Sequence, residues 1–259
     1  MHMKKGVLLF IALAIVMLFA CLSCEKSSDN GQDPVENGGE QPDIPDVVDN
    51  DPITGTVTGT YTVPTQKSTD GGTVTVSRTP RSVAKFKELR GQIAKEPHGA
   101  AACFVVALHM FMENPTVGEE CLALSVTPSQ RDAKNPKRLA SVRQILYDRY
   151  YKKDSGANIY SPWIPYCYIE GFQVAPGWKK PNPPYKMIFG HNPGKDNIDQ
   201  SASGTFHGYS IPMTIDAFNN TTSTQSRHRN ITAVKIKGEE QYVLIDFDDL
   251  INTASYKRP

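Results

Sequence analysis

The 259-residue sequence lacks the short motifs by which many enzymes are recognised. It contains no Gly-rich phosphate loop and no serine nucleophile elbow, and no pair of carboxylates can be placed across a glycosidic bond from spacing alone. Cysteine is scarce as well, with five residues in the chain, but a folded part of about 200 residues buries enough surface to be stable without disulfides. No residue pattern therefore dictates a reaction.

Basic residues do not gather into a stripe that could follow a nucleic acid. The formal net charge is +1. Residues 1–51 hold 3 of the 28 bases and 9 of the 27 acids, so the rest of the chain keeps 25 bases and 18 acids, a net charge of +7. These bases form short clusters on separate predicted elements, so we expect a solvated positive face and no nucleic-acid partner.

The longest apolar run lies at the N-terminus. Residues 7–22 follow Lys4 and Lys5 and are shorter than the ~20 residues that a membrane-spanning helix needs. The run ends in small residues and not in a basic flank. We therefore expect residues 1–24 to be a cleaved export signal of the lipoprotein type.

Two cysteines in this segment could accept the lipid. Cys24 follows the small residue Ser23 and directly precedes a polar stretch, so we expect lipidation there, with Cys21 as the alternative. An ordinary signal peptide is the competing interpretation. A multi-chain lipid on Cys24 would anchor the protein durably, because a single acyl chain binds a membrane only marginally.

Acidic residues dominate the segment that follows. Residues 25–51 contain nine Asp and Glu against one Lys, with several Pro and Gly between them. Such a composition cannot bury a core, so residues 25–53 are expected to form a solvated, extended tether. Acidic residues close behind a lipidated cysteine resemble surface-export signals of Bacteroidetes lipoproteins. We expect an outer-membrane lipoprotein on the periplasmic or the cell-surface face.

The remaining residues, 54–259, read as one α+β domain in three parts. Residues 54–78 alternate Thr and Val around an Asp-Gly pair, which predicts a β-hairpin. Residues 79–151 predict about four helices, and residues 160–251 predict an antiparallel sheet that ends in a hairpin. The expected helices begin at Thr79-Pro80 and cover residues 97–112, 117–124 and 135–150. The expected strands cover residues 163–170, 185–189, 209–215, 231–237 and 241–247.

Four blocks of this part resemble a known family. They are EPHGAAACFVVALHMF at 96–111, GEECLAL at 118–124, IPYCYIEG at 164–171 and PPYKM at 183–187. In this order they resemble an uncharacterised domain of unknown function found in lipoproteins and secreted proteins of Bacteroidetes and other gut anaerobes. The resemblance covers roughly residues 80–250. It implies an exported α+β domain without an assigned activity, and it supplies no catalytic residues.

Three cysteines fall in the folded part. Cys103 and Cys121 lie in apolar segments that predict helices, which favours small buried side chains over a disulfide between them. Cys167 could act as a nucleophile with His191 or His207 as its base. However, it lies in a predicted strand without the turn or helix start that usually activates a thiolate. An envelope hydrolase with a thiol or metal site is therefore the alternative function.

Other polar residues give weaker indications. His191, Asp196, Asp199 and His207 lie in one Gly- and Asn-rich loop, but their spacing fits neither a calcium loop nor a zinc helix, and we expect no metal. His109 continues the apolar register of its helix, which predicts a hydrogen-bonded core histidine and not a ligand. No cofactor is expected.

Aromatic residues offer a more attractive binding site. Trp163, Trp178 and Tyr185 lie close together in the sequence, and PGWKKPNPP places Trp178 on a Pro-rich loop. An exposed indole can stack on a sugar ring, a peptide or a partner protein. The alternatives are that Trp163, Tyr166 and Tyr168 fill the helix-facing side of the sheet and that Trp178 serves structural packing. The favoured function is a non-enzymatic ligand- or partner-binding module for a glycan, a peptide or an envelope protein.

Overall fold

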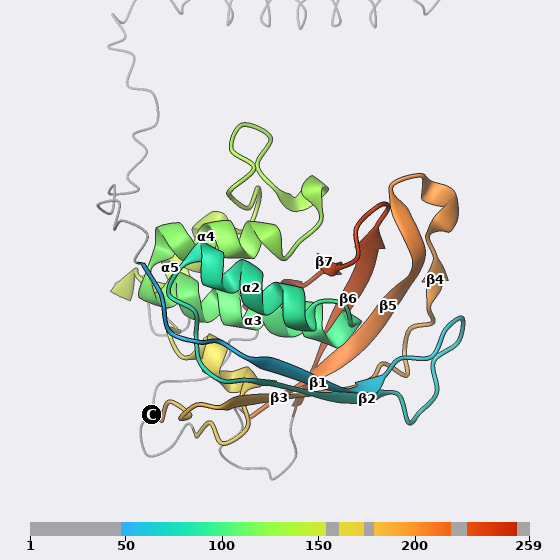
Figure 1. Ribbon diagram of the computed structural model, residues 1–259, viewed down its shortest axis with the longest axis horizontal. Helices are drawn as coiled ribbons and strands as arrows, with labels where there is room; N and C mark the ends of the chain where they lie inside the picture. The colour runs from blue at the N-terminus through green and yellow to red at the C-terminus, as the bar shows by residue number, and fades with distance from the viewer. Residues whose placement is uncertain (1–47, 154–160, 174–178, 219–226, 253–259) are drawn as a thin grey trace, which may run out of the picture. The chain divides into compact units, whose positions relative to one another are not determined.

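The computed structural model describes residues 48–153, 161–173, 179–218 and 227–252 (Figure 1). All of them belong to one compact unit. Five helices cover a seven-stranded antiparallel sheet, so the predicted α+β class is confirmed. Within the described residues, no helix is both long and apolar enough to cross a membrane.

The sheet has the strand order β1-β2-β3-β5-β6-β7, and β4 pairs with β5. Its strands are β1 (Gly55–Thr60), β2 (Gly71–Val76), β3 (Tyr185–His191), β4 (Ile198–Asp199), β5 (Phe206–Ala217), β6 (Arg227–Ile236) and β7 (Tyr242–Asp246). The predicted N-terminal hairpin, β1–β2, joins the main sheet because β2 pairs with β3. The predicted closing hairpin, β6–β7, turns at Gly238, whose φ of 86° suits glycine.

The helices lie on one face of this sheet (Figure 1). They are α2 (Val83–Ile93), α3 (Pro97–Glu113), α4 (Pro115–Leu124), α5 (Arg143–Tyr150) and α6 (Asp248–Asn252), with short 3-10 turns at η1 (Pro128–Gln130), η3 (Ile164–Tyr168) and η4 (Ser201–Ser203). The predicted helices at residues 97–112 and 117–124 are confirmed with slightly wider bounds. Helix α6 has no counterpart among the predicted elements.

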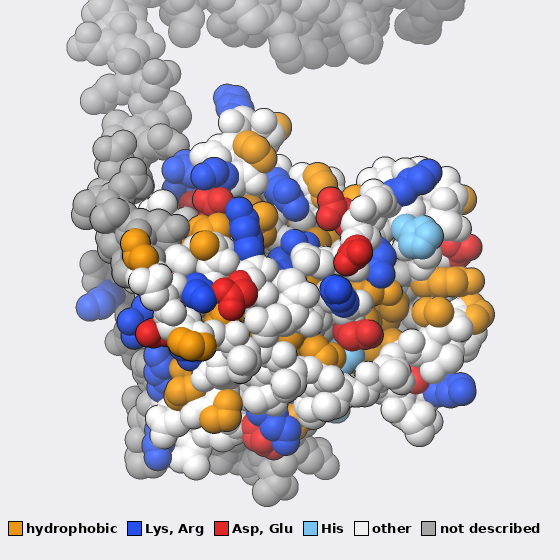
Figure 2. Space-filling model, in the orientation of Figure 1, with side chains coloured by type: hydrophobic (Ala, Val, Ile, Leu, Met, Phe, Trp, Pro, Cys, Tyr) orange, Lys and Arg blue, Asp and Glu red, His pale blue; other side chains and the backbone are white. Residues whose placement is uncertain are grey.

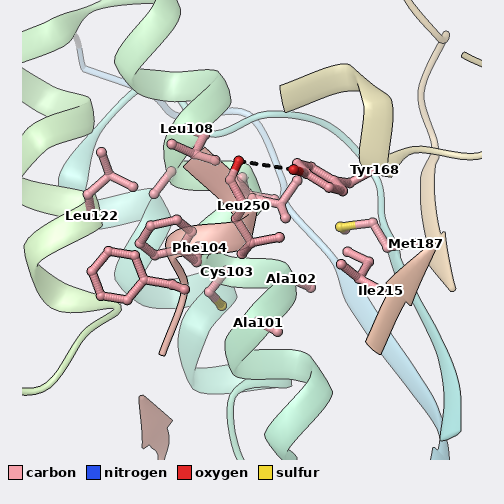
Figure 3. Close-up of a cluster of buried hydrophobic side chains, with 14 of the residues drawn as sticks. Ala101, Ala102, Cys103, Phe104, Leu108, Leu122, Tyr168, Met187, Ile215 and Leu250 are labelled. Atoms are coloured by element: carbon pink, nitrogen blue, oxygen red, sulfur yellow. Dashed lines mark hydrogen bonds between the residues drawn. The ribbon is translucent and has the colours of Figure 1, made fainter. Parts of the chain in front are cut away.

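Helix α3 runs through the interior, as its apolar sequence predicts. Its side chains are buried along nearly its whole length (Figure 3). Close packing at both ends depends on glycine. A Cβ on Gly99 would lie 1.8 Å from the Ile93 carbonyl oxygen, and one on Gly118 of α4 would lie 2.0 Å from the Phe111 nitrogen. Figure 3 also shows Tyr168, whose hydroxyl donates to the Leu250 carbonyl at 3.0 Å.

The folded unit begins earlier than the predicted tether boundary at residue 53. Ile53 is buried in the core. Asp49 accepts hydrogen bonds from Nη1 and Nη2 of Arg78, each at 2.9 Å, and from the Arg81 backbone N–H at 2.8 Å. These contacts attach the last residues of the acidic segment to the start of the helical part.

The strand predicted at residues 163–170 is wrong. The segment instead forms the 3-10 helix η3, in which the Tyr166 N–H donates to the Trp163 carbonyl at 3.0 Å. Pro165 explains the difference, since it has no N–H for a strand ladder and its fixed φ suits the first turn of a helix. The closely spaced aromatic residues of this segment are typical of a strand, although Pro165 favours a helical turn.

Two predicted helix starts are also wrong. Helix α2 begins at Val83, because Ser82 caps it by accepting a hydrogen bond from the Lys85 N–H at 3.2 Å. Helix α5 begins at Arg143 and not at residue 135. Asp132 accepts hydrogen bonds from the backbone N–H groups of Lys134 and Asn135 and so forms a turn there.

The outer edge of β7 is closed by the chain that follows α4. The Leu244 N–H donates to the Ser125 carbonyl at 2.9 Å, and the Thr127 N–H donates to the Leu244 carbonyl at 3.0 Å. Residue Val126 forms a parallel bridge with Leu244. Near the hairpin turn, the Tyr242 N–H donates to the Ala94 carbonyl at 2.8 Å. The backbone N–H groups of Tyr242 and Leu244 therefore have partners on the outer side of this strand.

Candidate functional site

Cys167 lies on η3 and is 1% exposed. Its thiol donates to the Trp163 carbonyl at 3.7 Å, and burial raises the pKa of the thiol well above its ordinary value. Within the described residues, neither His191 nor His207 hydrogen-bonds this sulfur; His191 ends β3 and His207 is exposed on β5. The three residues therefore do not form a nucleophile and base pair in this structure.

Cys103 and Cys121 lie in the core, and Asp199 is held by a neighbouring serine. Cys103 and Cys121 are buried thiols without a disulfide between them. Asp199 accepts hydrogen bonds from the backbone N–H and the hydroxyl of Ser201, at 2.8 and 2.6 Å. In the described part of the chain, no group of three or more His, Cys, Asp or Glu residues could hold a metal ion.

The predicted aromatic site is largely part of the core. Trp163 and Tyr185 are each 5% exposed, so their rings offer little surface to a ligand. Tyr185 packs edge-on against His109 of α3, with ring centroids 5.7 Å apart. Lys180 lies 5.0 Å from the ring centroid of Tyr166. Trp178 lies outside the described residues.

His109 is a buried, neutral member of this aromatic cluster. Its ring centroid is 4.4 Å from that of Tyr166. Within the described residues neither ring nitrogen has a partner at hydrogen-bond geometry, although the Pro165 carbonyl lies close enough to favour the protonated form. Burial has the larger effect and lowers the pKa of His109 to about 4. The predicted burial of this histidine is confirmed, whereas the hydrogen bond expected for it is not found among the described residues.

A pocket that the sequence does not indicate lies beneath the loop between β3 and β4. Two asparagines hold this loop, one to strand β6 and the other to the loop between β1 and β2. Asn192 donates from Nδ2 to Oδ1 of Asn230 on β6 at 3.1 Å, and Asn197 donates to the Thr62 carbonyl at 2.8 Å. The side chain of Gln66 donates to Oδ1 of Asn197 at 2.9 Å. These bonds fix the loop over the sheet.

Pro212 forms part of the pocket because the sheet has a gap beside it. On one side of β5, the pairing with β4 ends at Ser210 and the pairing with β3 begins at Met213. Pro212 lies between these two segments, and its carbonyl accepts from Gln66 Nε2 at 2.5 Å. A proline without an N–H is tolerated at such an interruption of the ladder.

The pocket has a volume of about 380 Å³, which falls within the ~300–1,000 Å³ typical of ligand sites. Its lining residues come from the loop and three strands: Lys195, Asp196, Ile198, Ser210, Pro212 and Thr232. Ile198 is 62% exposed, and Figure 2 shows hydrophobic side chains gathered over β4. Lys195 forms a 3.3 Å ion pair with Asp246 beside the pocket. The pocket thus combines an apolar wall with hydroxyl and charged groups.

The residues of this pocket could not be grouped from the sequence, for a physical reason. Its residues come from strands that meet only in the sheet, since Pro212 and Thr232 are paired neighbours on β5 and β6. One local signal was present, because Pro212 interrupts an otherwise strand-like run. A proline in a predicted central strand indicates a break in the ladder.

Residues 78–255 match the sequence model of a family described as Domain of unknown function (DUF6935). No curated protein and no solved structure matches the chain.

Proposed function

The chain belongs to the DUF6935 family, whose function is unknown, and we propose from the chain's own residues that it is an envelope lipoprotein that binds a ligand without transforming it. Cys24 carries the lipid, an acidic tether lies within residues 25–53, and the α+β unit is displayed on the periplasmic or cell-surface face of an outer membrane. The export signal and the acidic segment behind it support this location.

The pocket under the β3–β4 loop is the observation that carries the binding function. Ile198 and Pro212 offer apolar contact, while Ser210 and Thr232 offer hydroxyl groups to a polar ligand. Pockets that combine apolar walls with a few polar groups are characteristic of ligand sites. A glycan unit or a short peptide segment fits this chemistry, because each carries apolar and hydrogen-bonding groups side by side.

Ile198 supplies the sharpest test because its side chain is largely exposed. The lipidated protein in detergent would be screened against a glycan array and a peptide library, and hits would be measured by calorimetry. Ile198→Ser should weaken binding about tenfold, as expected for the loss of one buried aliphatic contact. Ile145→Ser is the matched control, since Ile145 is an exposed isoleucine on α5. Equal affinity of wild type and Ile198→Ser would contradict the pocket as the binding site.

We propose Trp178 as a second ligand contact, because it lies in the Pro-rich sequence PGWKKPNPP, which favours an exposed loop. Trp178→Ala should weaken the capture of an envelope partner or glycan without lowering thermal stability. A fall in stability with unchanged binding would assign Trp178 to packing instead.

A further inference from the structure

The side-chain amide of Gln66 joins two walls of the pocket under the β3–β4 loop. Its Nε2 donates to the Pro212 carbonyl at 2.5 Å and to Oδ1 of Asn197 at 2.9 Å. Pro212 lines the pocket, and Asn197 lies in the sequence between the lining residues Asp196 and Ile198. A primary amide has two N–H donors, so these bonds use the full donor capacity of the Gln66 side chain and fix the end of the amide that faces the wall.

The carbonyl oxygen of the same amide has no partner. Within the described residues, Oε1 of Gln66 is buried and accepts no hydrogen bond. Pro212 accounts for this. The N–H and C=O of one strand residue point to the same side, so another residue at this position could donate back to the amide, whereas proline has no N–H. A buried acceptor without a donor is unfavourable and uncommon.

Covalent geometry places this oxygen beside the pocket. The nitrogen and oxygen of an amide are roughly 2.3 Å apart, so Oε1 of Gln66 lies within about 5 Å of the carbonyl oxygen of Pro212. The terminal torsion of a glutamine side chain is soft, and Gln66 is half-buried. A ligand group that contacts Pro212 in the pocket therefore comes within reach of Oε1 after a small turn of the amide.

The other polar groups of the lining are mostly acceptors. The Ser210 hydroxyl donates its hydrogen to the Ile198 carbonyl at 3.3 Å, which leaves its lone pairs for a ligand. The carboxylate of Asp196 also accepts. Lys195, the one cation among the lining residues, is engaged by Asp246 at 3.3 Å. The pocket therefore suits a ligand that brings several donors. One cation and one anion in its lining leave no net charge that would select an ion.

We propose that the pocket binds a neutral sugar and that Oε1 of Gln66 accepts a hydrogen bond from one of the sugar hydroxyl groups. This inference rests on the proposed binding function of the pocket and specifies its ligand. A sugar ring presents several hydroxyl donors beside C–H groups that can pack on Ile198 and Pro212. A peptide backbone offers one N–H donor per residue, fewer than the acceptors of this lining can use. Gln66 is thus a specificity residue, because it selects a ligand with a donor at one position.

Calorimetric titration of the full-length protein in detergent tests the ligand class. The probes are the methyl glycosides of glucose, galactose, mannose and xylose, and an acetylated, amidated alanine tripeptide and propylammonium represent the alternatives. At least one glycoside should bind, and Ile198→Ser should weaken its binding about tenfold. Binding of no glycoside, or tighter binding of the tripeptide or the ammonium, would overturn the sugar. If the tripeptide then depends on Ile198, the binding function of the pocket still stands.

Fluorine in place of single hydroxyl groups of the bound glycoside tests the contact with Gln66. A fluorine keeps nearly the size of the hydroxyl but cannot donate. At one position it should weaken binding to the wild type about tenfold, and it should have little effect in Gln66→Met, which lacks the amide oxygen. Asn197→Ala is the control, because it removes one partner of Nε2 and leaves Oε1 in place, so this variant should keep the wild-type discrimination.

The wild-type series alone can overturn the contact, so the test does not depend on the folding of a variant. If every fluorinated glycoside binds the wild type as its parent does, no hydroxyl donates to Gln66. Equal losses in wild type and Gln66→Met would assign the hydroxyl contact to another residue. In both cases a tenfold effect of Ile198→Ser would leave the pocket as the binding site, whereas no effect of Ile198→Ser would contradict the proposed function itself.

Discussion

Asp49 and Arg78 form a two-pronged ion pair that joins the end of the acidic segment to the folded unit. Nη1 and Nη2 of Arg78 lie 2.9 Å from Oδ2 and Oδ1 of Asp49, respectively. Arg78 also donates from Nε to the Pro52 carbonyl at 3.0 Å. A residue that composition assigns to the tether is thus part of the domain.

Asp49→Asn should lower the free energy of unfolding by about 1–2 kcal/mol, because Arg78 loses its charged partner while the side chain keeps its size. Urea unfolding followed by circular dichroism measures the change. Glu88→Gln is the control, since the Lys85–Glu88 pair is exposed on α2 and such pairs contribute about 0–1 kcal/mol. Equal losses in both variants would show that the Asp49 pair is no stronger than a surface pair.

The same variant has a defined pH dependence. Burial of Asp49 favours its neutral form, but hydrogen bonds from Arg78 and Arg81 outweigh this and hold the pKa of the carboxyl below its ordinary value. Its contribution is therefore present above the unfolded pKa of about 3.9 and is lost as pH falls through the folded pKa. The stabilities of wild type and Asp49→Asn should converge below about pH 4. A difference that stays constant down to pH 3 would argue against this ion pair.

His109 should make the domain sensitive to mild acid. Its folded pKa is about 4, whereas an unfolded histidine titrates near 6.5. Between these values the unfolded chain binds a proton that the folded chain rejects, so stability falls as pH decreases, by roughly 3 kcal/mol in total. His109→Gln should flatten this dependence in unfolding curves measured from pH 7 to 4. Burial also lowers the pKa of His98, which leaves a residual slope.

His207→Gln is the control for this experiment, because His207 is exposed. It should follow the wild-type pH dependence. If His109→Gln keeps the full wild-type slope as well, the buried imidazole is not the group that titrates.

Gly118 should tolerate no side chain. A Cβ there would lie 2.0 Å from the Phe111 nitrogen, and backbone atoms in two packed helices cannot move aside cheaply. Gly118→Ala should destabilise the domain by about 2–4 kcal/mol in thermal unfolding. Gly91→Ala is the opposite case, since the nearest atom to its Cβ is 4.0 Å away. It should stabilise α2 by about 0.5–1 kcal/mol, and similar effects of both variants would contradict the packing of α3 against α4.

The proposed lipid anchor predicts what mass spectrometry should find at the N-terminus. Mass spectrometry of the mature protein should find Cys24 as the first residue, carrying a diacylglycerol thioether. Cys24→Ser should leave an unlipidated precursor, while Cys21→Ser should still give the membrane-bound form. A soluble product with an unmodified Cys24 would refute the anchor, and a lipid on Cys21 would move it three residues upstream.

Elements with a strong local pattern were predictable. The β6–β7 hairpin was predictable from its two strand-like runs and from Gly238, which supplies the turn. Helix α3 was predictable from its apolar sequence and from Pro97 at its first position. In these cases the residues that specify the element lie within it.

Features created by distant contacts were not predictable. The Pro212 carbonyl accepts a hydrogen bond from the side chain of Gln66, which lies 146 positions earlier in the chain. No periodic pattern within a local stretch of sequence predicts such a distant partner. At η3 a local signal existed in Pro165, but the alternation of aromatic residues around it is also typical of a strand. The fold class therefore followed from the sequence, whereas the pocket required the structure.

Closure of β7 by residues 125–127 has a consequence under the proposed membrane anchor. Copies tied to one membrane would collide often and in similar orientations, conditions under which an open strand edge would recruit a neighbour into a growing sheet. The backbone hydrogen bonds of Leu244 with Ser125 and Thr127 occupy the groups that a strand of another copy would pair with. At this edge of the sheet, copies can therefore come into contact without forming an intermolecular sheet.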